Sequence, residues 1–258
     1  MPHPPTSFDP TSADEQAPPP PSAPPEQLSP RAVLQPPLSR RGAGPGLILL
    51  LPDETEPSRR RQKPLDPDPV QKWAEEGFAV VAITGPPSPA HDIADAVEAL
   101  KKHAAVDAKD KIGIVSYGPL HPPVPARMPP EIVCVAAFAE PAPSPSPVPT
   151  YFHACGARDG RETTGTTGHA SASVSWYPNT RRHFVLPGSA AYSPAPASLA
   201  HTRNLAFLKK HIGGPVFDIE AVWEEHTRWE FERRSVAQTM ATMVVRARRL
   251  PLPVSPAR

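Results

Sequence analysis

The stretch DKIGIVSYGPL, from Asp110 to Leu120, has the composition of a short buried strand that runs into a sharp turn. In many hydrolases a strand of this kind presents a nucleophilic serine or cysteine on the turn. Here the turn reads Tyr117-Gly118-Pro119, and a glycine has no side chain that can attack a carbonyl carbon. The sequence therefore raises the question of whether this is a catalytic turn that lacks its nucleophile.

Three neighbouring groups could replace a missing nucleophile. Ser116 is a candidate, although two residues of extended chain separate its hydroxyl from position 118 by roughly 6–7 Å. Tyr117 is adjacent, but a phenol is a poor nucleophile at neutral pH. Cys155 ends another predicted strand, where the simpler interpretation is a buried thiol that packs as a small apolar side chain. Cys134 lies inside an apolar run and is predicted to be core.

No metal site and no cofactor are expected. His121, His153 and His169 lack the spacing that metal ligands show. His226 and Glu230 are four residues apart on a predicted helix, but two residues do not make a metal site, and a surface pair is the simpler interpretation.

Short apolar runs alternate with amphipathic segments from Gly46 to Gly214. This alternation predicts an α/β fold with a mostly parallel sheet and helices on both faces. In such sheets functional residues gather at the carboxyl ends of the strands. The predicted strands are GLILLLP, FAVVAIT, KIGIVSY, EIVCVAAFA, PTYFHAC and ASVSWYP, and the predicted helices are PDPVQKWAEEG, AHDIADAVEALKKHAAV and SLAHTRNLAFLKKHIGG.

Several of these segments, in this order, resemble the dienelactone hydrolase family, a branch of the α/β-hydrolase fold. The resemblance covers Pro45 to Gly214. It is carried by VQKWAEEGFAVVAIT, KIGIVSYG, VPTYFHACGARD, YPNTRRHFVLPGSAAY and AHTRNLAFLKKHIGG. It implies an enzyme that hydrolyses a lactone or carboxylic ester with a Cys-Asp-His triad, in which the thiolate attacks, the histidine manages the proton and the aspartate orients the histidine.

The resemblance assigns the triad positions residue by residue. His183 matches the histidine, Asp159 matches the acid, and Gly118 stands at the nucleophile. The helix after the turn should supply an oxyanion donor, but PLHPPVPARMPP cannot form a regular helix because proline costs roughly 3 kcal/mol inside one. Hydrolysis is therefore expected to be weak or absent. The alternatives are a non-catalytic binding or scaffold protein that has lost its nucleophile, and a fragment of a larger two-domain protein.

Composition limits the partners and the environment. The formal net charge of +1 favours neither nucleic acid nor an anionic membrane, and no apolar run has the length of a membrane helix. Two cysteines cannot form a disulfide framework, and the beginning of the chain does not read as a secretory signal, so a cytoplasmic location is expected. The PSRRRQKP run and the TTGTTGHASAS run are predicted to be surface loops.

Both ends of the chain differ from the hydrolase-like segment 45–214. Thirteen of the 41 prolines fall within residues 1–40, so residues 1–44 are predicted to be a disordered or polyproline-II tail. Deletion of residues 1–40 is expected to leave the melting temperature nearly unchanged. Within residues 215–258, one long amphipathic helix is predicted over 219–245. It resembles the first helix of a SnoaL-like domain of the NTF2-like superfamily. Its apolar face, with Trp223 and Trp229, predicts a protein partner or self-association.

Overall fold

The structure is a computed structural model that describes residues 9–16, 23–39, 41–53, 65–85, 91–119, 128–141, 146–156, 163–167, 170–214 and 219–243. The chain divides into two compact units. One unit is Ala23–Pro215 and contains the sheet. The other combines Met1–Ser22 with Val216–Arg258.

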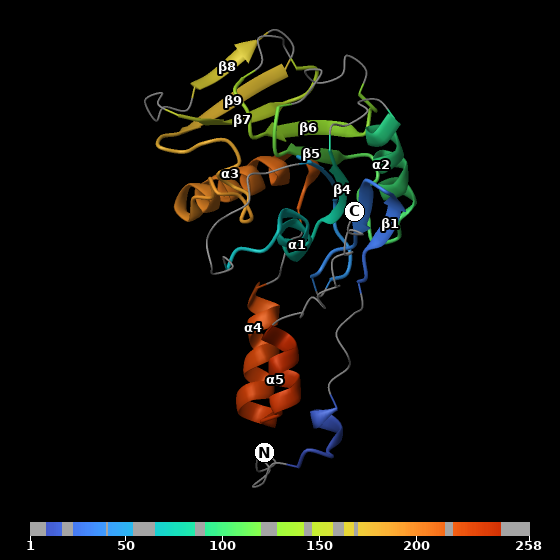
Figure 1. Ribbon diagram of the computed structural model, residues 1–258. Coiled ribbons are helices and arrows are strands. Elements are labelled where there is room, and N and C mark those ends of the chain that lie inside the picture. Colours follow the sequence, from blue (N-terminus) through green and yellow to red (C-terminus); the bar gives the residue numbers. More distant parts are fainter. Residues whose placement is uncertain are drawn as a thin grey trace, which may run out of the picture. The chain divides into compact units, whose positions relative to one another are not determined.

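The larger unit contains a nine-stranded sheet in the order β1-β2-β4-β3-β5-β6-β7-β9-β8 (Figure 1). The neighbours from β4 to β9 are all parallel, whereas β1, β2 and β8 pair antiparallel at the two edges. The predicted α/β fold with a mostly parallel sheet is confirmed. The strands are β1 Glu26–Ser29, β2 Ala32–Gln35, β3 Gly46–Leu51, β4 Ala79–Thr84, β5 Ile112–Ser116, β6 Ile132–Ala137, β7 Thr150–Cys155, β8 Thr163–Thr167 and β9 Ala170–Tyr177.

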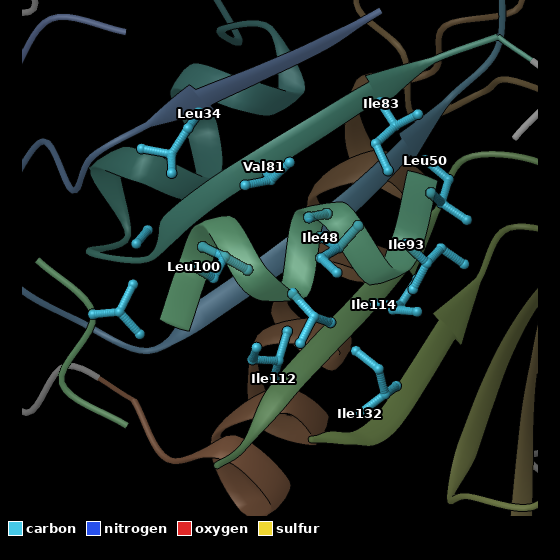
Figure 2. Close-up of a cluster of buried hydrophobic side chains, with 14 of the residues drawn as sticks. Leu34, Ile48, Leu50, Val81, Ile83, Ile93, Leu100, Ile112, Ile114 and Ile132 are labelled. Carbon is cyan, nitrogen blue, oxygen red and sulfur yellow. The ribbon is translucent and has the colours of Figure 1, made fainter. Parts of the chain in front are cut away.

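Helices cover both faces of this sheet. The helix α2 (His91–Lys102) places Ile93, Val97 and Leu100 against one face. Figure 2 shows Ile93 and Leu100 of this helix over the isoleucines of β3 and β5. The helices α1 (Pro69–Glu75) and α3 (Pro194–Ile212) cover the other face. The central strands are buried on both sides and therefore read as continuous apolar runs in the sequence.

The contact between α3 and β5 is close because residue 113 is glycine. A Cβ atom at Gly113 would lie 3.0 Å from Leu208 Cδ2 and 3.2 Å from Ile212 Cδ1, both on α3. Any larger side chain would push the helix away from the strand. The strand that leads to the Tyr117-Gly118 turn is thus held directly beneath α3.

Two local predictions were wrong, and two others concern residues that the structure does not describe. Residues 23–39 belong to the fold and not to a disordered tail, since they form β1 and β2 and bury Leu34 in the core. The TTGTTGHASAS run forms β8 and the beginning of β9 and not a surface loop. The PSRRRQKP run lies outside the described residues, as do residues 1–8 and 17–22 of the predicted tail.

The smaller unit holds a helical hairpin where a single helix was predicted over 219–245. The helix α4 (Ile219–Thr227) continues as a π-helix, η2 (Arg228–Arg233), and α5 (Val236–Met243) follows after a break. Arg234 ends the first helix in the left-handed conformation, with φ 54°. Ser235 begins the second by accepting a hydrogen bond from the backbone N–H of Gln238.

A short N-terminal segment contributes to the same unit. Residues Ala13–Glu15 form a 3-10 helix, η1. The Glu15 carboxylate accepts hydrogen bonds from the backbone N–H groups of Val236 and Ala237, at 3.1 and 3.0 Å. These N–H groups have no partner within α5, so Glu15 acts as its N-terminal cap.

The edge strands predict different effects for two truncations. Deletion of residues 1–22 should leave the melting temperature of the sheet-containing unit within about 2 °C of the full chain, whereas deletion of residues 1–40 removes β1 and β2 and should lower it by at least about 6 °C. Leu34→Ala in the full chain should cost about 2–5 kcal/mol and keep the fold measurable. Thermal unfolding followed by circular dichroism checks all three, and equal melting temperatures for the two truncations would contradict the packing of β2.

Candidate functional site

The triad positions implied by the resemblance follow strands whose carboxyl ends meet at one edge of the sheet. Gly118 follows β5, the segment of Asp159 follows β7, and His183 follows β9. Because these strands run parallel, their carboxyl ends lie along the same edge of the sheet. Asp159 lies outside the described residues.

The turn at Gly118 differs from a catalytic elbow in its backbone. In the α/β-hydrolases the nucleophile occupies a strained turn between strand and helix. Gly118 is not among the residues with positive φ, so its backbone conformation is open to any residue. The turn is instead closed by Ser116, whose hydroxyl donates a hydrogen bond to the Gly118 carbonyl at 2.8 Å. Ser116 is buried, and this bond directs its hydroxyl into the turn.

Tyr117 fixes the turn against α1. Its hydroxyl accepts a 2.9 Å hydrogen bond from the indole N–H of Trp73, and both side chains are buried. Its ring stacks on Phe138, which follows β6, with centroids 5.2 Å apart. Burial raises the pKa of the Tyr117 hydroxyl far above neutral pH. Tyr117 is therefore a packing residue that supplies no nucleophile.

His183 lies on the loop after β9 in a constrained position. Its backbone is left-handed, with φ 67°, and its carbonyl accepts a hydrogen bond from the N–H of Leu186. The next side chain, Phe184, is buried beside Tyr177 and anchors the loop. Among the described residues the buried Nε2 atom of His183 has no hydrogen-bond partner. Burial, and secondly the charge of Arg182, lower the pKa of His183, which favours the neutral imidazole.

Ser116 and His183 do not form a catalytic pair in this arrangement. The Ser116 hydroxyl is directed to the Gly118 carbonyl, and Nε2 of His183 accepts no proton from any described side chain. A nucleophile must lie within hydrogen-bond reach of its base before the base can activate it. The candidate nucleophile, at the end of β5, and the candidate base, on the loop after β9, are therefore not hydrogen-bonded to each other.

Arg182 is the residue of this edge that the sequence interpretation missed. A Cβ atom placed on Gly118 would lie 3.5 Å from Nη2 of Arg182, and that guanidinium is the nearest group to it. No carboxylate or carbonyl among the described residues pairs with Arg182. A cationic side chain thus stands beside the place where the resemblance puts a nucleophile. The only available signal was its position next to His183 in the RRHF sequence.

The two cysteines are also unsuited to attack. Cys134 is buried in β6, and burial raises the pKa of its thiol to about 12. Cys155 ends β7, is half-buried, and has a thiol pKa that is likewise raised by burial. Because the thiolate is the reactive form, both thiols are kept unreactive at neutral pH. This agrees with the prediction that both pack as small apolar side chains.

A buried polar network lies behind this edge. His153 of β7 is fully buried, with Nδ1 2.8 Å from the Tyr177 hydroxyl and Nε2 3.1 Å from Oδ1 of Asn204. The amide oxygen of Asn204 can only accept, so Nε2 carries the proton and Nδ1 accepts from the tyrosine. The ring of His153 stacks on Phe138 at 4.8 Å. The network joins β7, β9 and α3 into one support for the loop of His183.

Comparisons with known proteins do not identify a family. A scan against models of known protein families found no match, and a search of curated proteins found none either. Among the described residues no group of three or more histidine, cysteine or acidic side chains could hold a metal ion. None of the described helices is both long enough and apolar enough to cross a bilayer. His226 and Glu230 do form the predicted pair, at 3.2 Å.

The buried His153 predicts a pH dependence of stability. Burial lowers its pKa from an ordinary value of 6.5 to about 4, so the unfolded chain takes up a proton that the folded chain refuses. Stability is then highest above pH 6.5 and falls as the pH drops from 6.5 towards 4, by up to about 1.4 kcal/mol per pH unit from this group. Urea unfolding at several pH values measures the slope.

The control for this prediction is His153→Gln, which retains a donor and an acceptor without a titrating ring. This variant should be less stable at every pH but should show a slope smaller by about one proton between pH 6.5 and 4.5. An unchanged slope would mean that other groups carry the acid sensitivity.

Proposed function

We propose that the chain is a dienelactone hydrolase-like protein of the α/β-hydrolase type in which hydrolysis of lactones and carboxylic esters is weak or absent. The observation that carries the proposal is the turn at Gly118, which offers no attacking atom and places the Arg182 guanidinium beside the vacant position. The arrangement of strands supports the first half of the proposal, and the environment of the turn supports the second.

The order of the matched positions along the chain supports the hydrolase assignment. In α/β-hydrolases the nucleophile, the acid and the histidine follow one another in that order. Here Gly118, Asp159 and His183 come after β5, β7 and β9, three parallel strands. His183 is held by a buried aromatic anchor and a buried network, as a working base would need to be.

The oxyanion donors support the loss of turnover. The N–H of the residue that follows the nucleophile normally stabilises the oxyanion of the tetrahedral intermediate. That residue is Pro119, which has no N–H. Removal of one such donor costs roughly a hundredfold to a thousandfold in rate, in addition to the missing nucleophile. The chemistry therefore lacks both the attacking atom and one stabilising donor.

The position of the Arg182 guanidinium beside Gly118 favours a second candidate function, a non-catalytic binding protein. A guanidinium is a fixed cation with planar donors that suit carboxylates. It would hold an acidic small molecule beside Gly118 in place of an ester carbon under attack. His183, neutral by its lowered pKa, would then contribute a hydrogen bond and no proton transfer.

Ester hydrolysis tests the proposed loss of turnover. Purified wild-type protein should hydrolyse a small activated aryl ester at a rate within about twofold of the buffer background, and His183→Ala should not change it, because no nucleophile is activated. The rate is followed by absorbance of the released phenol. Thr202→Ala, an exposed change on α3, serves as the matched control. A wild-type rate well above background that is lost only in His183→Ala would overturn the proposal.

Gly118→Cys tests the local environment of the turn. The nearby guanidinium should lower the pKa of the introduced thiol by roughly one from its usual 8.5. At pH 7 iodoacetamide should alkylate it several-fold faster than the native thiols, and Arg182→Gln in the same chain should slow that reaction. Mass spectrometry of the labelled peptides measures both rates.

The same variant should still fail to hydrolyse the ester, because Pro119 supplies no donor. Gly118→Cys with Pro119→Ala restores an N–H at this position and is the comparison for that claim. Thiol-dependent turnover in Gly118→Cys with Pro119 retained would show that the oxyanion argument is wrong.

A further inference from the structure

The helical hairpin of the smaller unit has no hydrophobic core of its own. Within residues 9–16 and 220–242, the only buried side chains are Ser235 and Thr242, both polar. Helices as short as α4 and α5 are marginal in water unless an apolar face is covered. We therefore expect another surface to cover the apolar side chains of the hairpin and to stabilise it.

Large apolar side chains are concentrated on this hairpin. Five of the eight large apolar residues that are exposed in the described chain belong to it, and Trp223 and Phe231 are the most exposed of the five, at 65% and 67%. The five are Val222, Trp223, Phe231, Val236 and Met240. Exposed apolar residues clustered in this way mark an interaction surface.

The π-helix brings the two aromatic side chains to one side. In a regular α-helix eight residues make about 2.2 turns, so Trp223 and Phe231 would diverge. The wider turn of η2, which begins at Arg228, places more residues in each turn. The eight residues then make closer to two full turns, which brings Trp223 and Phe231 towards the same face of the helix.

The charges on the same helix are arranged for an antiparallel copy. The helix α4 carries Glu220, Glu224 and Glu225 and no lysine or arginine, whereas residues 228–234 carry three arginines against two glutamates. One of those glutamates, Glu230, is already paired with His226 at 3.2 Å. A second copy running in the opposite direction would place each acidic end against a basic end.

We propose that the α4–η2 helix forms a two-fold symmetric, antiparallel pair with the same helix of a second copy of this chain, with the axis near Thr227. Trp223 lies four residues before Thr227 and Phe231 four residues after it. The axis therefore sets each Trp223 against Phe231 of the other copy, as a self-complementary interface requires. The acidic α4 of each copy then faces the arginines of the other.

The size of the contact predicts a weak dimer. Two tryptophans and two phenylalanines, each about two-thirds exposed, would bury roughly 500 Å² when paired. This is below the ~1,000 Å² of a stable interface, although Val222, Val236 and Met240 can add to it. Sedimentation velocity of the full chain should therefore show a monomer at ~1 μM and a growing dimer fraction towards ~300 μM.

Cross-linking at the proposed axis is the decisive experiment. Thr227→Cys, with Cys155→Ser to remove the half-buried thiol, should be joined into a covalent dimer by a short bismaleimide. Thr202→Cys in the same background is the matched control, because both threonines lie on helices and donate to the carbonyl of the fourth preceding residue. The axis predicts at least about tenfold faster dimer formation for Thr227→Cys. Equal rates for the two variants would overturn the proposal.

Charge reversal tests whether the face of Trp223 and Phe231 pairs with a second copy of this chain or binds another partner. Glu220→Arg with Glu224→Arg, and separately Arg233→Glu with Arg234→Glu, should each shift the monomer–dimer equilibrium at least about fivefold towards monomer. All four changes together should restore the dimer. Asp95→Arg on α2 is the control and should have no effect. The proposal would be wrong if the chain stayed monomeric at all concentrations, or if the charge reversals left the dimer unchanged. The face would then belong to another partner.

Discussion

The hydrogen bond from Trp73 to the Tyr117 hydroxyl is the contact on which the carboxyl edge of the sheet depends. It ties the turn after β5 to α1 and orients the Tyr117 ring so that it stacks on Phe138. Phe138 in turn stacks on His153, whose ring bonds to Tyr177 and Asn204. The chain of contacts runs from α1 through three strand ends to α3, and it gives the edge a rigid aromatic wall.

The same wall explains why the polar groups at this edge are not placed for nucleophilic attack. Buried polar groups are costly unless they are paired, and here the buried hydroxyls of Ser116 and Tyr117 are both engaged in the turn. A group engaged in this way cannot also approach a base. Arg182 and His183 lie on a single loop. Their side chains are suited to forming hydrogen bonds to a ligand and not to nucleophilic attack on it.

The sequence predicted those elements whose burial leaves a regular pattern of apolar residues along the chain. Strands such as β3 and β4 are buried on both faces and read as unbroken apolar runs, and α2 shows its buried face at helical spacing. The strands β1 and β2 have four residues each and lie among prolines, so no period could reveal them. The guanidinium of Arg182 lies beside Gly118, which is distant in sequence, and local sequence contains no information on this proximity.

The break in the C-terminal helix shows a different limit of sequence interpretation. The amphipathic pattern over 219–245 is real, but both α4 and α5 satisfy it, so the pattern does not tell one helix from two. The break depends on Arg234 in a left-handed conformation and on caps from Ser235 and from Glu15, which is distant in sequence. These bonds satisfy the backbone N–H groups at the break. The exposed apolar side chains on either side of the break are therefore not what holds the two helices together there. They are left available for an interface, and for that reason the face of Trp223 and Phe231 is the part of this unit where a partner should be sought.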